Sequence, residues 1–510
     1  MAKLTCSADR GHRPSPERAS HVGECSIVET ASQTLHRLTS YGPYDPDNPD
    51  AIWDPPVDDP RVVQDLVVND LDRLPYFFKS YAEELPRIPL PRQLPSTTTP
   101  AVTVLAGTAG IAPSACDLSQ LSRLLHLSAG VTRTAVRPYA TWQFRAAGSA
   151  GGRFPLELYV AVPEGSALPV GVHWYHPRDH ALLQVGPPPR GGVPTVIITG
   201  VPWRTGWRYR ERGYRHVYWD AGTMLSQLLA LADSAGVRPF LFTRFPDADV
   251  ASLVGADRVH EWPAAMVALG DAAPAIEATG PAVAGEVDAA PIEFPLATAA
   301  QRAGDLDTLG QAWDRGAPAP APIEMSHPVD TVVLARGSTK LLDQTQGLPE
   351  EVLRTSMLAA MRGVDVPHFV VVHDVDGLAP GVYRWPDATT PSPDRDLRED
   401  LYRAALEQGL ARDAAFVVIG ADDVGALDDR GYRETQLAAG LVEGRLHLLA
   451  YALGAAACGM TFADSEIPAL LGESLDGLLL TCVGVPEYTS ATGGPPGDPT
   501  EVTLVTPRSS

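Results

Sequence analysis

A repeated helical segment constrains the fold of this chain more than any other feature. Residues 213–236, GYRHVYWDAGTMLSQLLALADSAG, align without gaps on residues 431–454, GYRETQLAAGLVEGRLHLLAYALG. Nine of the 24 aligned positions are identical, whereas chance pairing at average composition gives about two. Both segments have the apolar spacing of a helix and end on glycine, a common helix-terminating residue.

Further matches flank this repeat in the same order. FPDADVASLVG (245–255) matches FADSEIPALLG (462–472), and GVHWY (171–175) matches GVYRW (381–385). Each copy of the latter follows an apolar stretch that predicts a buried strand. The common order and near-constant spacing indicate a duplicated domain of roughly 150–200 residues.

The repeat and the composition together predict how the 510 residues are divided. A Pro- and Ala-rich stretch separates the two copies and is typical of a linker, and both chain ends are polar without a lasting period. The predicted parts are a disordered or extended N-terminus (1–35), an N-terminal region (36–116), domain 1 (117–270), a linker (271–330), domain 2 (331–490) and a flexible tail (491–510).

Charge and cysteine usage exclude several classes of protein. The 62 acidic residues against 40 Lys and Arg give a net charge of −22, which would repel nucleic acid or a membrane surface. The chain has no apolar run of about 18 residues that could span a membrane. Its beginning has no apolar signal segment, and its five cysteines form no CxxC pair, which favours the cytoplasm. His173, His176 and His180 alternate between the faces of one predicted hairpin (171–186), so we interpret them as surface histidines and predict no metal site.

The order of strand, hairpin, strand, Gly-Tyr-Arg helix and F-x-D segment resembles the nitroreductase superfamily of flavin enzymes. The SagB-type peptide dehydrogenases of that superfamily are the most similar, over residues 35–270 and again 330–490. His36 and residues 78–81 and 88–91 are similar to the SagB-type N-terminal region. The resemblance implies an α+β, nitroreductase-like fold duplicated in one chain as an internal pseudo-dimer. It also implies flavin mononucleotide (FMN) at the interface and a pseudo-dimer that is compatible with a monomeric chain.

The resemblance assigns two flavin segments, one to each half. Arg336, Ser338 and Lys340 are similar to the family's phosphate-binding segment, and Arg can contact two phosphate oxygens at once. Residues 145–152, RAAGSAGG, are similar to the segment beside the flavin ring, which the family takes from the partner subunit. Neither segment has a counterpart in the other half. We therefore expect one complete flavin site in each chain.

Within the ring segment, three residues are candidate cofactor contacts. Arg145 opens the segment, Ser149 could donate a hydrogen bond to the polar edge of the ring, and Gly151 would let the backbone approach it. The alternative for this stretch is an ordinary loop before a strand.

Two further segments complete the expected site by the same resemblance. The backbone of Gly459, Met460 and Thr461 would lie against the flavin N5, where an amide donor stabilises the reduced ring. SagB-type enzymes commonly carry a Lys-Tyr pair before the Gly-Tyr-Arg helix, and here Arg208 and Tyr209 stand in that place. Arg stays protonated and cannot act as the base, so Tyr209 is the candidate base and Arg208 its electrostatic neighbour.

These resemblances imply an FMN-dependent dehydrogenase that oxidises thiazoline or oxazoline rings of a ribosomally made peptide to thiazoles or oxazoles. The implied partners are the peptide substrate and a cyclodehydratase complex, with no nucleic acid and no membrane. Two alternatives stay open. One is an NAD(P)H-dependent reductase of nitro, enone or quinone compounds, and the other is a non-catalytic partner in a peptide-modifying complex.

Overall fold

The computed structural model describes residues 29–45, 47–48, 59–62, 66–387 and 390–507. Most of the N-terminus that we expected to be disordered or extended lies outside this range. Its last residues instead begin helix α1 (Ala31–Thr39), because the hydroxyl of Thr30 caps the helix and Gln33 completes a capping box.

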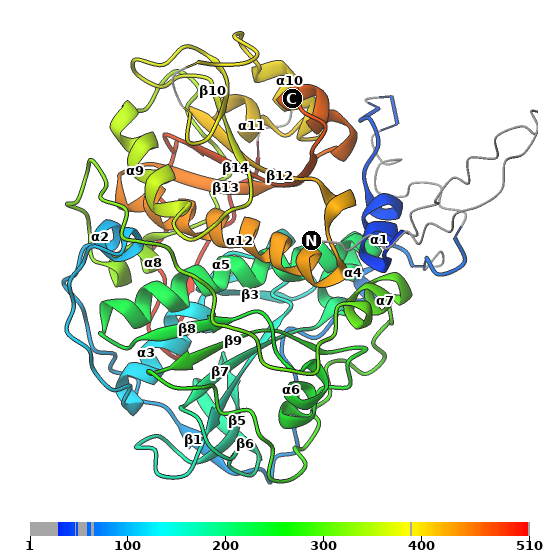
Figure 1. The fold of residues 1–510 in the computed structure, drawn as a ribbon, viewed down its shortest axis with the longest axis vertical. Coiled ribbons are helices and arrows are strands. Elements are labelled where there is room, and N and C mark those ends of the chain that lie inside the picture. Colours follow the sequence, from blue (N-terminus) through cyan, green and yellow to red (C-terminus); the bar gives the residue numbers. More distant parts are fainter. Residues whose placement is uncertain (1–28, 46, 49–58, 63–65, 388–389, 508–510) are drawn as a thin grey trace, which may run out of the picture.

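The first half is built on a seven-stranded antiparallel sheet and the second half on a five-stranded one, shown below and above the middle of Figure 1. The first sheet has the order β1-β6-β5-β4-β7-β9-β8, with β1 (Arg87–Pro89), β4 (Leu156–Val162), β5 (Gly171–His176), β6 (Ala181–Gly186), β7 (Thr195–Gly200), β8 (Pro239–Phe242) and β9 (Trp262–Leu269). The second has the order β11-β10-β12-β14-β13, with β10 (His368–Val372), β11 (Gly381–Arg384), β12 (Phe416–Asp422), β13 (Ala456–Met460) and β14 (Asp476–Gly484).

The two sheets share one strand order. If the strands are numbered along the chain within each half, leaving out β1 and β6, both sheets read 2-1-3-5-4. The predicted strands and the hairpin at 171–186 are present, and β4, β5, β7 and β9 are buried. A chain that passes twice through this order is consistent with the repeated motifs of the sequence.

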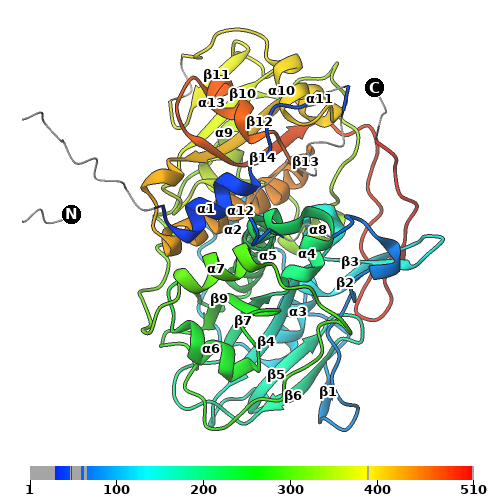
Figure 2. The same cartoon turned by 90° about the vertical axis from the view of Figure 1, so that its right-hand side faces the viewer.

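Two long helices lie between the sheets and form the centre of the molecule: α5 (Gly213–Ser234) and α12 (Asp429–Ala452) (Figures 1 and 2). Both are buried along nearly their whole length because each contacts a sheet on one side and the other helix on the other. The remaining helices are α2 (Ala101–Ala106), α3 (Leu118–Ala129), α4 (Pro202–Tyr209), α6 (Asp247–Val254), α7 (Pro295–Ala303), α8 (Val329–Ala335), α9 (Glu350–Ala360), α10 (Arg398–Ala404), α11 (Gly409–Asp413) and α13 (Ile467–Leu471).

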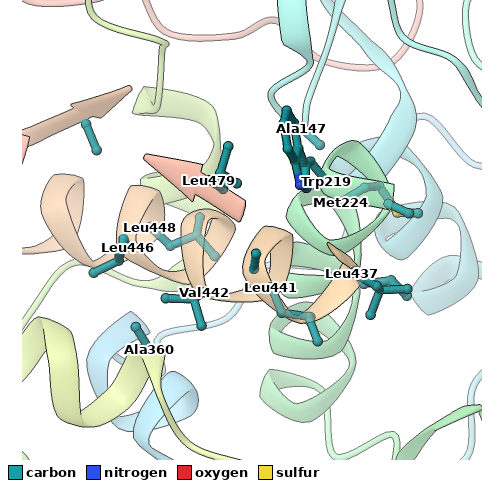
Figure 3. Close-up of a cluster of buried hydrophobic side chains, with 14 of the residues drawn as sticks. Ala147, Trp219, Met224, Ala360, Leu437, Leu441, Val442, Leu446, Leu448 and Leu479 are labelled. Carbon is teal, nitrogen blue, oxygen red and sulfur yellow. The ribbon is translucent and has the colours of Figure 1, made fainter. Parts of the chain in front are cut away.

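Glycines at matching positions of the repeat allow α5 and α12 to cross closely. A Cβ on Gly222 would lie 2.3 Å from the carbonyl oxygen of Leu437, and one on Gly440 would lie 2.3 Å from that of Trp219. Each glycine therefore faces the backbone of the opposite helix. Apolar side chains close the crossing on both sides, among them Trp219, Met224 and Leu441 (Figure 3).

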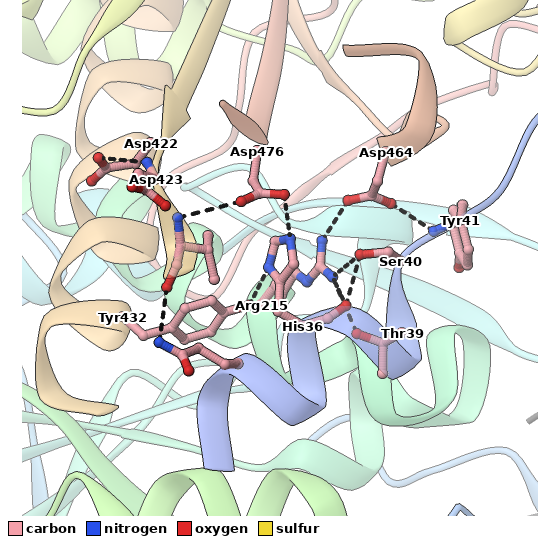
Figure 4. A network of polar contacts seen from close by, with 12 residues as sticks. His36, Thr39, Ser40, Tyr41, Arg215, Asp422, Asp423, Tyr432, Asp464 and Asp476 are labelled. Atoms are coloured by element: carbon pink, nitrogen blue, oxygen red, sulfur yellow. Dashed lines mark hydrogen bonds and ion pairs between the residues drawn. The ribbon is translucent and has the colours of Figure 1, made fainter. Parts of the chain in front are cut away.

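The repeated polar motifs pair with each other across the crossing. Arg215, from the first Gly-Tyr-Arg, lies 2.7 Å from Asp464 of the second F-x-D segment, as Figure 4 shows. Arg433, from the second Gly-Tyr-Arg, lies 2.8 Å from Asp247 of the first. Such reciprocal contacts are the signature of a two-fold interface, here formed within one chain. All four side chains are buried, so each charge depends on its partner.

Two segments differ from the sequence predictions. Within the predicted flexible tail, β15 (Thr500–Glu501) pairs in parallel with β2 (Val131–Val136), which also pairs with β3 (Thr141–Arg145). The stretch 271–330 does join the halves, but it contains α7 and bonds to the first half along its length, for example through the backbone of Glu286 to Ser80.

Candidate functional site

The two predicted flavin segments meet at the interface of the halves, beside a pocket that the ring segment lines. Arg336 follows α8, and its Nη2 donates to the carbonyl of Ala146 in the ring segment at 2.6 Å. A Cβ on Gly148 would lie 3.3 Å from Arg336 Nη1 and 3.9 Å from Ser338 Oγ. Glycine at this position therefore lets the ring segment approach the end of α8. The structure thus brings together residues about 190 positions apart.

Arg336 contacts a chain of buried polar groups on helix α12. Its Nη1 lies 3.3 Å from Nδ1 of His447, whose Nε2 lies 3.1 Å from the carboxylate of Glu443. Glu443 also accepts a hydrogen bond from Thr223. Burial alone would raise the pKa of Glu443, but His447, Thr223 and Arg336 bring it below its ordinary value. Glu443 is thus the anionic counter-charge of Arg336.

This network limits what Arg336 can offer a ligand. Both Nη atoms have partners within the protein, and among the described residues only the buried Nε lacks one. The expected two-point contact with a phosphate is therefore not available in this arrangement. Ser338 and Lys340, in contrast, are exposed at the mouth of the cleft.

A second arginine, which the sequence did not single out, lies beside Arg336. Arg133 on β2 donates to the carbonyls of Leu334 and Ala491 at 2.5 and 2.7 Å. Burial, and then repulsion by Arg336, lower the pKa of Arg133 to about 10. Arg133 reaches α8 because the C-terminal segment folds onto β2, and no local pattern in the sequence signals that contact. With Lys340, these residues form a cationic corner at the end of α8.

A small pocket lies beside the ring segment, with an empty volume of about 270 Å³ that is partly open to solvent. It is lined by α3, α5 and the segment from Arg145 to Leu158, and most of its walls are apolar. One carboxyl group, Asp220 of α5, faces it. Asp220 is 5% exposed, and burial raises its pKa to about 8.

Asp220 fixes the ring segment from within. It accepts hydrogen bonds from the hydroxyl of Ser149 and, at 3.0 Å, from the backbone N–H of Ala150. Ser149 in turn accepts from the N–H of Phe154 at 2.7 Å. The hydroxyl that we predicted to face the flavin therefore closes the loop instead. Position 438 in the second copy is alanine where the first copy has Asp220, and this difference was a usable signal.

Arg145 lines the pocket but has a structural role in this arrangement. Its guanidinium donates to the carbonyls of Leu156 and Phe77 at 2.5 and 3.0 Å, and it lies 3.8 Å from Glu157. The contacts with Leu156 and Glu157 are buried, and that with Phe77 is partly buried. The structure therefore does not place a free Arg145 cation beside the predicted ring position.

Arg208 and Tyr209, at the end of α4, contact the other end of the ring segment. Gly151 has φ +59°, and a Cβ there would lie 2.8 Å from both the Tyr209 hydroxyl and Cδ of Arg208. The Tyr209 ring stacks on His216 with centroids 4.0 Å apart and planes 13° apart. Arg208 donates to the side chain of Asn69 at 3.2 Å. The predicted Arg-Tyr pair is therefore in contact with the ring segment, with its phenol held by a stacked ring.

The segment that we predicted to lie against the flavin N5 is largely part of a strand. Gly459 and Met460 belong to β13, the edge of the second sheet, and Thr461 follows it. A Cβ on Gly459 would lie 2.9 Å from Glu443 Oε1, so this edge contacts the network below Arg336. The buried hydroxyl of Thr461 has no partner among the described residues. Cys458 is buried, which raises the pKa of its thiol and argues against a reactive thiolate.

The donor set of this cleft fits FMN. The cationic corner of Arg133, Arg336 and Lys340 suits a phosphate, and the orphaned Arg336 Nε and Thr461 hydroxyl can serve as further donors. The Cβ side of Gly148 faces Arg336 and Ser338, and that of Gly151 faces Arg208 and Tyr209, so both glycines let the ring segment pack against these residues. These residues come from both halves, so neither half alone contains the site.

The described part of the chain contains neither a cluster of metal-ligating side chains nor a membrane-spanning helix. No group of three or more His, Cys, Asp or Glu side chains there could hold a metal ion. His173, His176 and His180 are buried, whereas we had interpreted them as surface residues. None of the helices described is long and apolar enough to cross a bilayer.

Comparison with known proteins defines the class of fold. No family model matches the chain. A crystal structure of a protein from Anabaena variabilis described as a nitroreductase aligns with 90% of this chain and 100% of its own, with a TM-score of 0.66 and 22% identity. The chain therefore has the α+β nitroreductase-like fold, and this alignment spans both halves.

A relative from Methanocaldococcus jannaschii, the protein MJ1384, is also named as a nitroreductase. It is 25% identical over 172 residues, which are 31% of this chain and 82% of that protein. The E. coli microcin synthetase McbBCD complex with truncated pro-MccB17 bound matches 35% of the chain with a TM-score of 0.26, too low to support an argument.

Proposed function

We propose that this protein is an FMN-dependent oxidoreductase of the nitroreductase superfamily, with two tandem copies of the domain and one flavin site per chain. The observation that carries the proposal is the meeting of the ring segment with the end of α8. Arg336 bonds to Ala146, and Gly148 lies close to both Arg336 and Ser338, so the two segments are in direct contact.

The chain's own residues have distinct roles in this proposal. Lys340 and Ser338, exposed at the mouth, and Arg336 and Arg133 behind them would hold the phosphate. Asp220 keeps residues 149–151 in place, and the edge of β13 closes the cleft near Glu443. When bound, FMN supplies a hydride acceptor or donor that none of the twenty side chains provides.

For the substrate we propose an azoline ring of a ribosomally made peptide. Oxidation of a thiazoline or oxazoline removes a hydride and a proton from adjacent ring atoms. Tyr209 would take the proton, because its hydroxyl lies against Gly151 and its ring is fixed by His216. Arg208 would stabilise the phenolate or hold a carbonyl of the peptide. A cyclodehydratase that forms such rings is the expected partner, and the cytoplasm the expected location.

Flavin stoichiometry tests the cofactor assignment. Purified protein reconstituted with FMN should bind one FMN per chain, measured from flavin absorbance after gel filtration. Two per chain would contradict the single composite cleft, and none would contradict the function itself.

Anaerobic flavin reduction separates the two directions of catalysis. We expect a synthetic thiazoline peptide to bleach the bound flavin faster than NADPH does. Rapid bleaching by NADPH alone would instead favour a reductase of nitro, enone or quinone compounds. The internal partners of Arg336 and Ser149 leave a non-catalytic role open, and peptide binding without FMN would support it.

A further inference from the structure

A second cleft, at the end of α2, is lined by arginines. It is small, partly open to solvent, and lies between α2, α5, α12 and the segment after α9. Arg315, Arg362 and Arg445 line it, and Asp233 is the one acidic residue among the described residues of its wall. The segments that suit FMN in the first cleft are missing here, since residues 107–112, GTAGIA, follow α2 where residues 336–340 follow α8.

The single acid is already paired. Arg315 binds the carboxylate of Asp233 through both Nη atoms, at 2.9 and 2.6 Å. Its buried Nε has no hydrogen-bond partner among the described residues. Arg362 and Arg445 therefore contribute two positive charges beyond the one that Asp233 balances. Arg445 is only 4% exposed, so solvent does little to screen its charge.

Backbone carbonyls offset part of the positive charge of Arg362 and Arg445. Arg362 donates to the carbonyl of Leu105 near the end of α2 at 3.1 Å, and Arg445 donates to those of Ala360 and Arg362 at 2.8 and 2.6 Å. The C-terminus of a helix carries about half a negative charge. The ends of α2 and α9 thus offset about one of the two positive charges, and about one remains.

The repeat shows that a hydrogen bond to the end of the helix packed beside it does not require a charged side chain at the position of Arg445. Position 227 in α5 corresponds to position 445 in α12, and the first copy has glutamine there. Gln227 donates to the carbonyl of Leu127 in the last turn of α3 at 2.8 Å, as Arg445 does at the end of α9. A neutral side chain therefore performs the same contact in the first half. The extra charge of Arg445 needs another explanation.

We propose that the second cleft is a binding site for a small oxyanion of the phosphate class. Three guanidinium groups from different segments converge on it, and Arg can donate paired hydrogen bonds to such an oxyanion. The anion would neutralise the residual charge and join α2, α12 and residue 315 at the interface of the halves. This site is independent of the flavin assignment.

Thermal unfolding of the FMN-loaded full chain tests this proposal. Inorganic phosphate should raise the Tm of the wild type by about 2–5 °C at a hundredfold excess over its Kd. Sodium chloride at equal ionic strength should not. Arg445→Gln, which copies the first half, should lose the phosphate response and be at least as stable as wild type in phosphate-free buffer. An undiminished response in Arg445→Gln, or strong destabilisation in both buffers, would overturn the proposal.

The first cleft provides the matched comparison. Arg336→Gln removes a cation there, and this variant should keep the phosphate response. A response lost in Arg336→Gln and kept in Arg445→Gln would place the anion in the first cleft and refute the assignment. Should Arg445→Gln fail to fold, titration calorimetry of phosphate into the wild type decides: one site per chain supports the proposal, and no heat of binding refutes it.

Discussion

The two clefts of this molecule share one frame but not one chemistry. The frame is symmetric: Gly222 and Gly440 form the helix crossing, and Arg215 and Arg433 each bind the aspartate of the opposite half. The lining of the clefts is not. The first has a glycine-rich loop, a cationic corner and a buried carboxyl, whereas the second has three arginines around one aspartate.

This difference shows which residues the fold itself requires. Contacts on the pseudo-two-fold axis serve both halves at once, so losing one of them destabilises the whole interface. Residues lining a single cleft serve only that cleft, and duplication within one chain lets each copy differ. The sequence repeat therefore marks the interface, and departures from it mark the sites.

The largest effect expected is on turnover in the first cleft. If Tyr209 removes the substrate proton, Tyr209→Phe should lower the rate of flavin reduction by a thiazoline peptide by about 10²–10⁴, with FMN still bound. Single-turnover flavin bleaching measures it. The control is Tyr214→Phe, whose buried hydroxyl has no hydrogen-bond partner among the described residues. A Tyr209→Phe rate within threefold of wild type would remove Tyr209 from the mechanism.

The second prediction uses Asp220 of the first cleft, whose counterpart in the second copy is alanine. Burial raises the pKa of Asp220 from 3.8 to about 8, and the nearby Glu443 adds to the shift. The folded state therefore holds a proton that the unfolded chain releases. The contribution of Asp220 to the free energy of unfolding is full at low pH and is lost as the pH rises through about 8. Between about pH 5 and pH 8 the loss is at most about 4 kcal/mol, at 1.36 kcal/mol per unit.

Asp220→Asn should flatten that dependence, because an amide does not ionise. Its Oδ1 can still accept from the N–H of Ala150, and its Nδ2 can donate to the hydroxyl of Ser149. Denaturant unfolding of both proteins across this pH range measures the difference. Parallel pH profiles would show that the Asp220 carboxyl does not titrate as its burial implies.

The third prediction compares arginines. Charge-assisted hydrogen bonds contribute about 1.5–3 kcal/mol, so Arg336→Gln should weaken FMN binding about 100-fold. Arg398→Gln is the control, since Arg398 also donates to a carbonyl, that of Arg412, but lies outside both clefts. Fluorescence titration with FMN gives both affinities. Equal affinities for the two variants would show that Arg336 only joins the halves through Ala146.

The sequence alone predicts the frame of this protein better than its site. Apolar periodicity is local, so the strands, the hairpin and both long helices follow from it, and the repeat adds the pseudo-symmetry. The partners of Arg336 and Ser149 are long-range: His447 and Asp220 reach them only after α5 and α12 have crossed. The contact between Arg133 and α8 depends on a tail whose short polar sequence shows no strand period.

The smallest effect expected falls on the symmetric frame and tests whether the two halves contribute equally to it. Gly222→Ala and Gly440→Ala each place a methyl group 2.3 Å from a carbonyl of the opposite helix. Overpacking costs typically 1–3 kcal/mol, and alanine's better helix propensity returns up to about 1 kcal/mol. We therefore expect each variant to lose about 1–2 kcal/mol of unfolding free energy in denaturant titrations. Gly42→Ala, with no atom within 4 Å of the added group, should lose almost nothing. Unequal losses would mean that the crossing is not symmetric in energy, and that one half tolerates the separation of α5 and α12 better than the other.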